Sequence, residues 1–141
     1  MSEVPVIFVN HHMAHHASVY YTSGKTEGLC LSLDGRGDNL SGSVATAAGG
    51  SIEMLSEIDS LNSIGHFYSA ITVASGFRAI RHEGKITGLA AFGKVDDSLL
   101  EEFRNIVYFS EDKKISTTLA DDLVVGPYPH ANFRGYIDKI E

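Results

Sequence analysis

The sequence predicts an α/β fold in which a mixed β-sheet is flanked by helices. An apolar, β-branched run near the start is typical of a buried strand. A helix-length segment and a second apolar strand follow it, and then come a glycine-turned hairpin and further amphipathic segments. This order is not the strict strand–helix alternation of a dinucleotide-binding fold. The 141 residues suit one domain.

The first elements follow from local signals. Residues 4–10 are expected to form the opening strand, with Pro5 near its start, where a missing N–H is tolerated. Asn10 can cap a helix over residues 11–21. After a turn, residues 28–33 form a second strand that runs into a glycine-containing loop.

The later elements are expected in the following order. Strands 41–47 and 51–58 form a hairpin that turns at Gly49 and Gly50. A helix over 63–75 is closed by Gly76, and a helix over 85–92 is stopped by Gly93. The last helix covers 99–107 and is capped by Asp97 or Ser98. Beyond Tyr108 the pattern weakens. Residues 114–119 suit a strand and 126–129 a loop.

The charge of the chain excludes some partners. A net charge of −7 repels phosphate backbones and anionic lipid, so no nucleic acid and no membrane is expected as a partner. The main concentration of cations is at Arg78, Arg81 and Lys85, with Lys94 nearby, which suits one phosphorylated small molecule. Cys30 is the single cysteine and lies in an apolar run, which predicts a buried thiol in a cytoplasmic, reducing setting.

The histidine-rich start of the first helix is the strongest candidate for a metal site. Two histidines four residues apart lie about 40° apart around a helix, so His11 can share an ion with His15, or His12 with His16, but the two pairs face different ways. Asp34, at the end of the second strand, is the candidate third ligand. Two imidazoles and one carboxylate suit Fe(II) or Zn(II). The alternative is a set of solvated or core hydrogen-bonded histidines.

The glycine loop after the second strand offers a phosphate site. Asp34, Gly35, Arg36 and Gly37 can form a tight turn whose backbone N–H groups cradle a phosphate. The dinucleotide fingerprint is absent because Leu40 stands where its third glycine would be. The P-loop is also absent, because Val19 stands where the first glycine before Gly24-Lys25-Thr26 would be. A plain connection between strands remains the alternative.

Taken together, these motifs form an ordered series between residues 6 and 94. The series comprises His11-His12-Met13-Ala14-His15, Ala17-Ser18, Leu33-Asp34-Gly35-Arg36-Gly37-Asp38, Ile64-Gly65-x-x-Tyr68-Ser69, Gly76-Phe77 and Glu83-x-Lys85-x-x-Gly88-Leu89-Ala90-Ala91-Phe92-Gly93. It resembles the O-carbamoyltransferases of nodulation-factor and antibiotic biosynthesis, whose main domain is similar to the tRNA threonylcarbamoyl-transfer protein. Residues 1–141 would then be part of the N-terminal domain, poorly defined over 108–141.

The resemblance implies a fold and a set of site residues. The fold would be a partial lobe of the actin, sugar-kinase and Hsp70 type, which is ribonuclease H-like. His11, His15 and Asp34 would hold an iron-type ion, and the loop from Asp34 to Gly37 would lie along the phosphates of ATP. Glu83 and Lys85 would be catalytic residues at the mouth of the site, with Lys85 attracting phosphate or carbamoyl oxygens. Their alternative role is that of a charged helix start.

The resemblance also implies an activity. ATP and carbamoyl phosphate would give a carbamoyl-adenylate, from which the carbamoyl group passes to a hydroxyl of a small-molecule acceptor. Family segments expected upstream and downstream are not found in this sequence, so the chain resembles an incomplete piece whose exposed lobe interface favours homo-oligomers. Two alternatives remain: threonylcarbamoyl transfer to tRNA, and a non-catalytic module that binds metal or nucleotide or self-associates.

The remaining histidines and aromatic residues are given structural roles. His12, His16, His66 and His82 are expected to be bystanders, the last two at the surface or at helix caps. The residues Tyr20, Tyr21, Phe67 and Tyr68 are expected to pack in the core.

Overall fold

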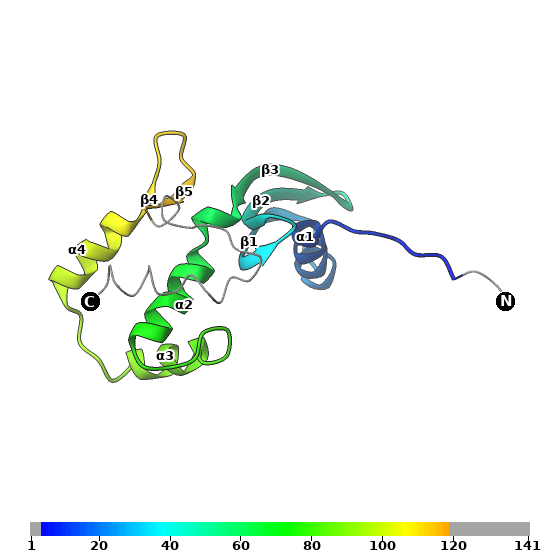
Figure 1. Cartoon of the computed structure of the whole chain (residues 1–141). Coiled ribbons are helices and arrows are strands. Elements are labelled where there is room, and N and C mark those ends of the chain that lie inside the picture. Colours follow the sequence, from blue (N-terminus) through cyan, green and yellow to red (C-terminus); the bar gives the residue numbers. More distant parts are fainter. Residues whose placement is uncertain (1–3, 119–141) are drawn as a thin grey trace.

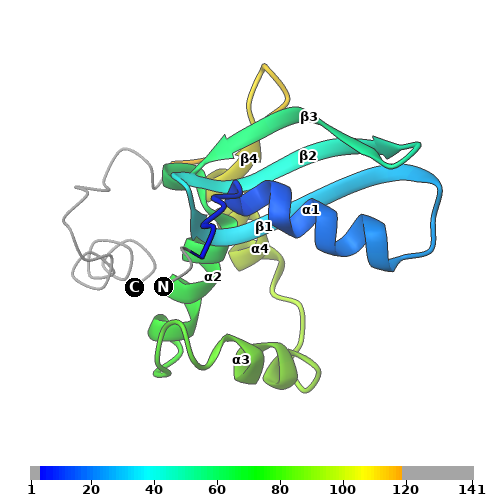
Figure 2. The same cartoon turned by 90° about the vertical axis from the view of Figure 1, so that its right-hand side faces the viewer.

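The computed structural model describes residues 4–118 and contains two antiparallel sheets and four α-helices. In chain order the elements are α1 (His11–Thr22), β1 (Glu27–Gly37), β2 (Leu40–Ala48), β3 (Ser51–Asp59), the 3₁₀ turn η1 (Ser60–Asn62), α2 (Ile64–Ala74), α3 (Glu83–Ala90), α4 (Asp97–Ile106), β4 (Val107–Phe109) and β5 (Ile115–Thr117). Helix α1 runs along the sheet β1-β2-β3, and α2 leads from one end of that sheet to α3 (Figures 1 and 2).

The three-stranded sheet is a meander of two hairpins. The β2–β3 hairpin turns at Gly49 and Gly50, as predicted, and both have positive φ angles of 57° and 82°. The β1–β2 hairpin turns at Asp38 and Asn39, also at positive φ, 51° and 65°. Two consecutive residues with positive φ match the right-handed twist of the flanking strands. The predicted glycine loop, residues 34–37, forms the end of β1 in the structure. The strand pairing is irregular there, with a register shift between Leu33 and Gly37.

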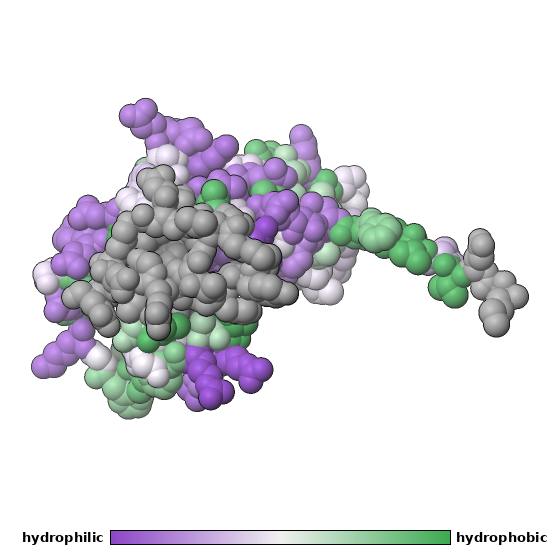
Figure 3. All heavy atoms as spheres, viewed as in Figure 1, coloured by the Kyte–Doolittle hydropathy of each residue, from purple (hydrophilic) through white to green (hydrophobic). Residues whose placement is uncertain are grey.

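The predicted strand over residues 4–10 is wrong. This segment lies outside every helix and strand, and its side chains are exposed, from 63% at Val9 to 94% at Phe8. It projects away from the body as an apolar extension (Figures 1 and 3). A strand needs a partner for its backbone groups, and no strand among residues 4–118 pairs with it. The predicted mixed sheet is also wrong. Without the opening strand, every strand pair in the described part of the chain is antiparallel.

The core between α1 and the sheet is small. Tyr20, Cys30, Ala45 and Ala47 are buried together, with Ile52 and Met54 packed against them. Cys30 is buried as predicted. Tyr21 is not a core residue: its side chain is 62% exposed, because it points off the sheet-facing side of α1 and its hydroxyl donates to the carbonyl of Gly50.

Helix ends follow the predicted capping chemistry with small shifts. Asn10 caps α1, as predicted, by accepting from the amide of Met13. Ser63, predicted as the first residue of the helix, instead caps α2 by accepting from the amide of His66. Helix α4 is capped by Asp96 rather than Asp97 or Ser98, because the Asp96 carboxylate reaches the amides of residues 98 and 99. The helix predicted over residues 99–107 ends one residue early, since Val107 begins the short strand β4.

The far face of the sheet is uncovered in the described chain. Alternate residues of β1 point away from α1, and three of them are leucines: Leu29, Leu31 and Leu33, exposed by 49–69%. Leu55 of β3 is also exposed, at 55%. None of the helices within residues 4–118 is long and apolar enough to cross a bilayer. Predictions for residues 119 and 126–129 lie outside the described residues.

Candidate metal centre

The first turn of α1 carries two of the candidate ligands. The Asn10 cap starts the helix at His11, and His15 follows one turn later on the same side. The amide of His11 donates to Oδ2 of Asp38 at 2.7 Å, which ties the start of α1 to the β1–β2 turn. Both imidazoles are partly open to solvent, with their side chains 38% and 48% exposed.

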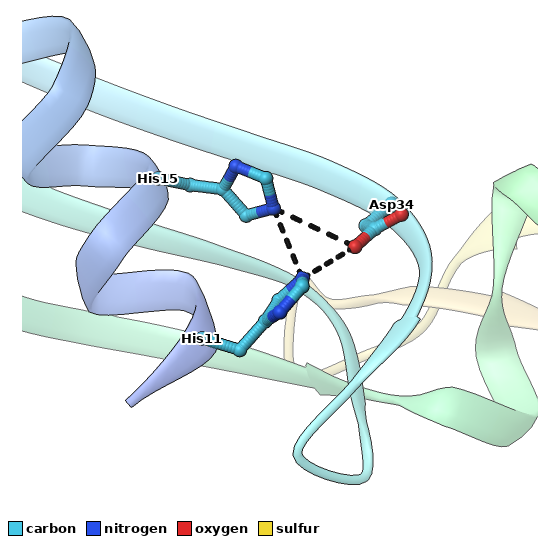
Figure 4. A group of neighbouring side chains, drawn as sticks. All are labelled: His11, His15 and Asp34. Atoms are coloured by element: carbon cyan, nitrogen blue, oxygen red, sulfur yellow. Dashed lines mark hydrogen bonds and ion pairs between the residues drawn. The ribbon is translucent and has the colours of Figure 1, made fainter. Parts of the chain in front are cut away.

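Asp34 lies at the irregular end of β1, opposite these imidazoles (Figure 4). Its Oδ1 accepts from the amide of Gly35 at 2.6 Å, which orients Oδ2 toward the helix. Oδ2 lies 2.6 Å from Nε2 of His11 and 3.6 Å from Nε2 of His15. The two Nε2 atoms are 3.0 Å apart. We call these three residues the triad.

The donor set of the triad fits a small divalent cation. Its ligand atoms all lie within 4.8 Å of one another. Ligands about 2.0–2.1 Å from a tetrahedral ion are roughly 3.3 Å apart, and the three observed separations bracket that value. A carboxylate oxygen only accepts hydrogen bonds, and a neutral imidazole carries one proton on two nitrogens, so lone pairs gather here. The solvent-facing side leaves coordination positions open.

The electrostatics of Asp34 favour its ionised form. Burial raises the pKa of the carboxyl group, but the hydrogen bonds from His11 and from the Gly35 amide outweigh this effect. The pKa of Asp34 is therefore below its ordinary value. An ionised carboxylate is the form that binds a metal.

Two glycines allow the triad to form, and the sequence pattern did not reveal their role. A Cβ atom on Gly37 would lie 2.1 Å from Cδ2 of His11, so the imidazole rests directly on this backbone. A Cβ atom on Gly65 would lie 2.8 Å from the carbonyl oxygen of Asp34, so α2 begins in tight contact with the end of β1. The sequence predicts Gly37 only as part of a phosphate loop. Its packing against His11 depends on the distance between α1 and β1, which the sequence motif does not contain.

The other two histidines of α1 face the sheet. His12 and His16 are buried, and their ring nitrogens lie 2.8 Å from Oγ of Ser32 and 2.8 Å from Oγ of Ser43, respectively. Neither belongs to the group whose ligand atoms converge.

The predicted catalytic residues are not brought to the triad. Glu83 accepts from the hydroxyl of Ser69 at 2.7 Å and from the amide of Ile80, and Nζ of Lys85 lies 6.0 Å from the ring centre of Phe77. Both residues are on α3, which packs against α2 and lies at the opposite end of α2 from β1 (Figures 1 and 2).

The remaining residues of the predicted phosphate loop have local contacts. The guanidinium of Arg36 donates to Oδ1 of Asn39 at 2.8 Å across the β1–β2 turn. His66 was expected at the surface or a cap, yet it is partly buried beside Gly35. Burial and the charge of Arg36 lower its pKa. The spacing of the sequence motifs does not predict that His66 lies next to the Asp34 segment.

A separate open groove of about 750 Å³ lies between β3 and the β4–β5 hairpin. Its lining includes Glu57, Asp59, Asp112 and Lys114 but no member of the triad. This groove is therefore separate from the metal-ligating cluster, and the donor geometry identifies the better candidate site.

Comparison with known proteins agrees with the motif series. A family model described as the carbamoyltransferase N-terminus matches residues 1–134. The nodulation protein NolO of Bradyrhizobium diazoefficiens is 36% identical over 88 residues, which cover 62% of this chain and 16% of that protein.

Two further relatives have no described activity. The uncharacterized protein MJ1051 of Methanocaldococcus jannaschii is 33% identical over 91 residues, covering 64% of this chain and 18% of its own length. The uncharacterized protein sll1178 of Synechocystis is 35% identical over 118 residues, covering 75% of this chain and 19% of its own length. The chain thus spans less than a fifth of each of these relatives.

Proposed function

This chain belongs to the carbamoyltransferase N-terminal family, and we propose that it supplies the metal-binding part of an enzyme that transfers a carbamoyl group to a hydroxyl of a small-molecule acceptor. The observation that carries the proposal is the convergence of His11, His15 and Asp34 within a chain of this family. The donor is a carbamoyl-adenylate made from ATP and carbamoyl phosphate. In the transfer step the acceptor oxygen bonds to the carbamoyl carbon, the bond from that carbon to the phosphate oxygen breaks so that AMP leaves, and the acceptor proton passes to a base.

The residues of the triad hold and orient an ion, Fe(II) in preference to Zn(II). The imidazoles of His11 and His15 and the carboxylate of Asp34 would be its protein ligands, and their partial exposure to solvent would leave room for the donor beside them. Such an ion, when bound, supplies positive charge that anchors phosphate oxygens and polarises the carbamoyl carbonyl. The backbone from Asp34 to Gly37 lies along the nucleotide phosphates, and Lys85 with Glu83 acts where the lobe closes on the donor.

The metal is tested by elemental analysis of the anaerobically purified chain and of His15→Ala. His15 is chosen because its side chain is 48% exposed, so its removal leaves little cavity. We expect about one iron or zinc per chain in the wild type and less than a tenth of that in the variant. His82→Ala, outside the triad, is the control and keeps its metal. Equal metal content in all three proteins would refute the assignment.

A non-catalytic binding module is the second candidate. It is favoured by the separation of α3 from the triad and by the small share of each relative that the chain covers. Titration with ATP and light scattering distinguish the two: the module binds metal or nucleotide, or self-associates, without carbamoyl transfer. Threonylcarbamoyl transfer to tRNA is disfavoured by the net charge of −7, and weak, salt-insensitive RNA binding would exclude it. We place the protein in the cytoplasm, where Cys30 stays reduced.

A further inference from the structure

The buried side of α1 is attached to the sheet by two histidine–serine pairs. His12 and His16 are 0% and 1% exposed, and each has a ring nitrogen within 2.8 Å of a serine hydroxyl, Ser32 on β1 and Ser43 on β2. Both serines are also buried, at 7% and 0% exposure. Buried polar groups of this kind form specific, directional contacts, because an unmade hydrogen bond in the interior is costly.

The two pairs join one turn of α1 to two neighbouring strands. Ser32 and Ser43 are direct partners in the antiparallel register of β1 and β2, so they lie next to each other across the two strands. His12 and His16 are one helical turn apart, a rise of about 6 Å along the axis of α1. Nδ1 of His12 lies 2.8 Å from Oγ of Ser32, and Nε2 of His16 lies 2.8 Å from Oγ of Ser43. Two attachments spaced along the axis fix both the rotation of α1 and its position along the sheet.

Besides the two pairs, the first half of α1 is attached at His11, whose amide donates to Oδ2 of Asp38, but it contributes no residue to the buried apolar core of the described chain. The apolar core that involves α1 is formed at Tyr20, more than two turns away from His12, together with Cys30, Ala45 and Ala47. Apolar contacts are non-directional, so they would tolerate a helix that turns slightly about its axis. A rotation of roughly 20° would displace an imidazole tip by about 2 Å, because the tip lies well outside the 2.3 Å backbone radius. That displacement exceeds what a metal site with bonds near 2 Å tolerates.

One nitrogen of His12 is left without a partner. Its Nε2 is buried and has no hydrogen-bond partner within the described chain. A proton on Nδ1, donated to Ser32, leaves an unpaired acceptor at Nε2, which is a smaller penalty than an unpaired N–H. Buried polar atoms without a partner are uncommon in native structures, so the contact of His12 with Ser32 is kept despite this cost.

We infer that His12 with Ser32, and His16 with Ser43, are positioning pairs that aim His11 and His15 at Asp34. This inference rests on the proposed metal site. The paired residues are neither ligands nor catalytic groups. They act through the helix, because His11 and His15 each lie one residue, or 100° of rotation, from a residue attached to the sheet. On this inference His12 and His16 are not bystanders, because they hold the two histidine ligands in position.

The test uses Ser32→Ala and Ser43→Ala, which remove one hydroxyl from each pair, with Ser41→Ala as the matched control. Ser41 is on the same strand as Ser43, is 2% exposed, and donates to the carbonyl of Asp59 rather than to α1. Zn²⁺ affinity and the Co²⁺ absorption spectrum are measured on the 141-residue chain. We expect about tenfold weaker Zn²⁺ binding and an altered Co²⁺ spectrum in both pair variants. The control should change affinity less than twofold.

A second measurement separates this inference from the metal assignment. The imidazole ¹⁵N resonances of His11 and His15, recorded on metal-free protein, report the contact with Asp34. A wild type that binds no metal would refute the metal site. Resonances that shift in the Ser32 and Ser43 variants, but not in the control, would then still support positioning.

Unchanged resonances, or affinities equal to the control, would overturn the inference. Where an alanine variant fails to fold, Ser32→Thr restores a hydroxyl in a residue that strands favour. It should bind Zn²⁺ within about threefold of the wild type.

Discussion

At the scale of single residues, the contact between Gly37 and His11 is the most demanding in the site. Replacing Gly37 by Ala would place a methyl group 2.1 Å from the imidazole and force the ring away from Asp34. We expect Zn²⁺ affinity to fall at least tenfold, as measured by competition with a chromophoric chelator. Gly35→Ala is the control, because its Cβ would meet only His66, at an ordinary 3.9 Å. Equal losses in the two variants would contradict this account.

Glu83 gives a residue-scale prediction about pH. Burial raises the pKa of its carboxyl group, but hydrogen bonds from Ser69 and the backbone lower it overall, below the ordinary value of 4.5. A depressed carboxyl pKa contributes stability that is complete above pH 4.5 and is lost as the pH falls through the folded-state pKa.

Urea unfolding between pH 6 and pH 3 measures this contribution. Glu83→Gln should lose less stability than the wild type over that range, because it has no proton to take up. Parallel pH profiles for the two proteins would show that the carboxylate of Glu83 does not contribute.

The sequence predicts the members of the triad better than it predicts their surroundings. His11 and His15 follow from helical spacing and Asp34 from its place at a strand end, and the structure brings the three side chains together. The contact of Gly37 with His11 and the attachment of His12 to Ser32 depend on how helix and sheet approach each other. No local pattern encodes that approach. The roles of Glu83 and Lys85 rest on family resemblance and stay predictions.

At the scale of elements, α1 depends on its cap. Oδ1 of Asn10 accepts from the amide of Met13 at 2.9 Å, and this bond sets the first turn, which carries His11. Asn10→Ala should lower the free energy of unfolding by about 1 kcal/mol. Chemical denaturation measures the loss. Asn10→Asp keeps the accepting oxygen and should retain most of the stability, whereas an equal loss in both variants would show that capping is not the cause.

The elements that the sequence predicted well carry their own signals. Gly49 and Gly50 mark the β2–β3 turn, and Ser63 with Gly76 marks the ends of α2. The sequence places the turn between β1 and β2 at Asp34 to Gly37, but the structure turns at Asp38 and Asn39, which adopt positive φ without a glycine. The strand predicted over residues 4–10 has the right composition, but strand formation requires a partner that residues 4–118 do not provide.

At the scale of the whole molecule, the open face of the sheet predicts self-association. Leu29, Leu31 and Leu33 are exposed side by side along β1, which is an edge strand of the sheet that residues 4–118 form. Exposed apolar patches and unpaired edges favour contact with a second copy. Sedimentation of the isolated chain should show dimers or larger species that Leu31→Glu reduces. Val19→Glu, at an equally exposed position on α1, should leave the distribution unchanged. A monomeric wild type would refute the prediction.

The unequal ends of α1 have a thermal consequence. Its C-terminal end rests on the apolar core around Tyr20, whereas its N-terminal end rests on the hydroxyls of Ser32 and Ser43. Exposure of apolar surface dominates the heat capacity of unfolding, and apolar contacts weaken on cooling. Detaching the N-terminal end exposes little such surface, so its heat-capacity change is small. The histidines are therefore held on the half of the helix that loosens least in the cold.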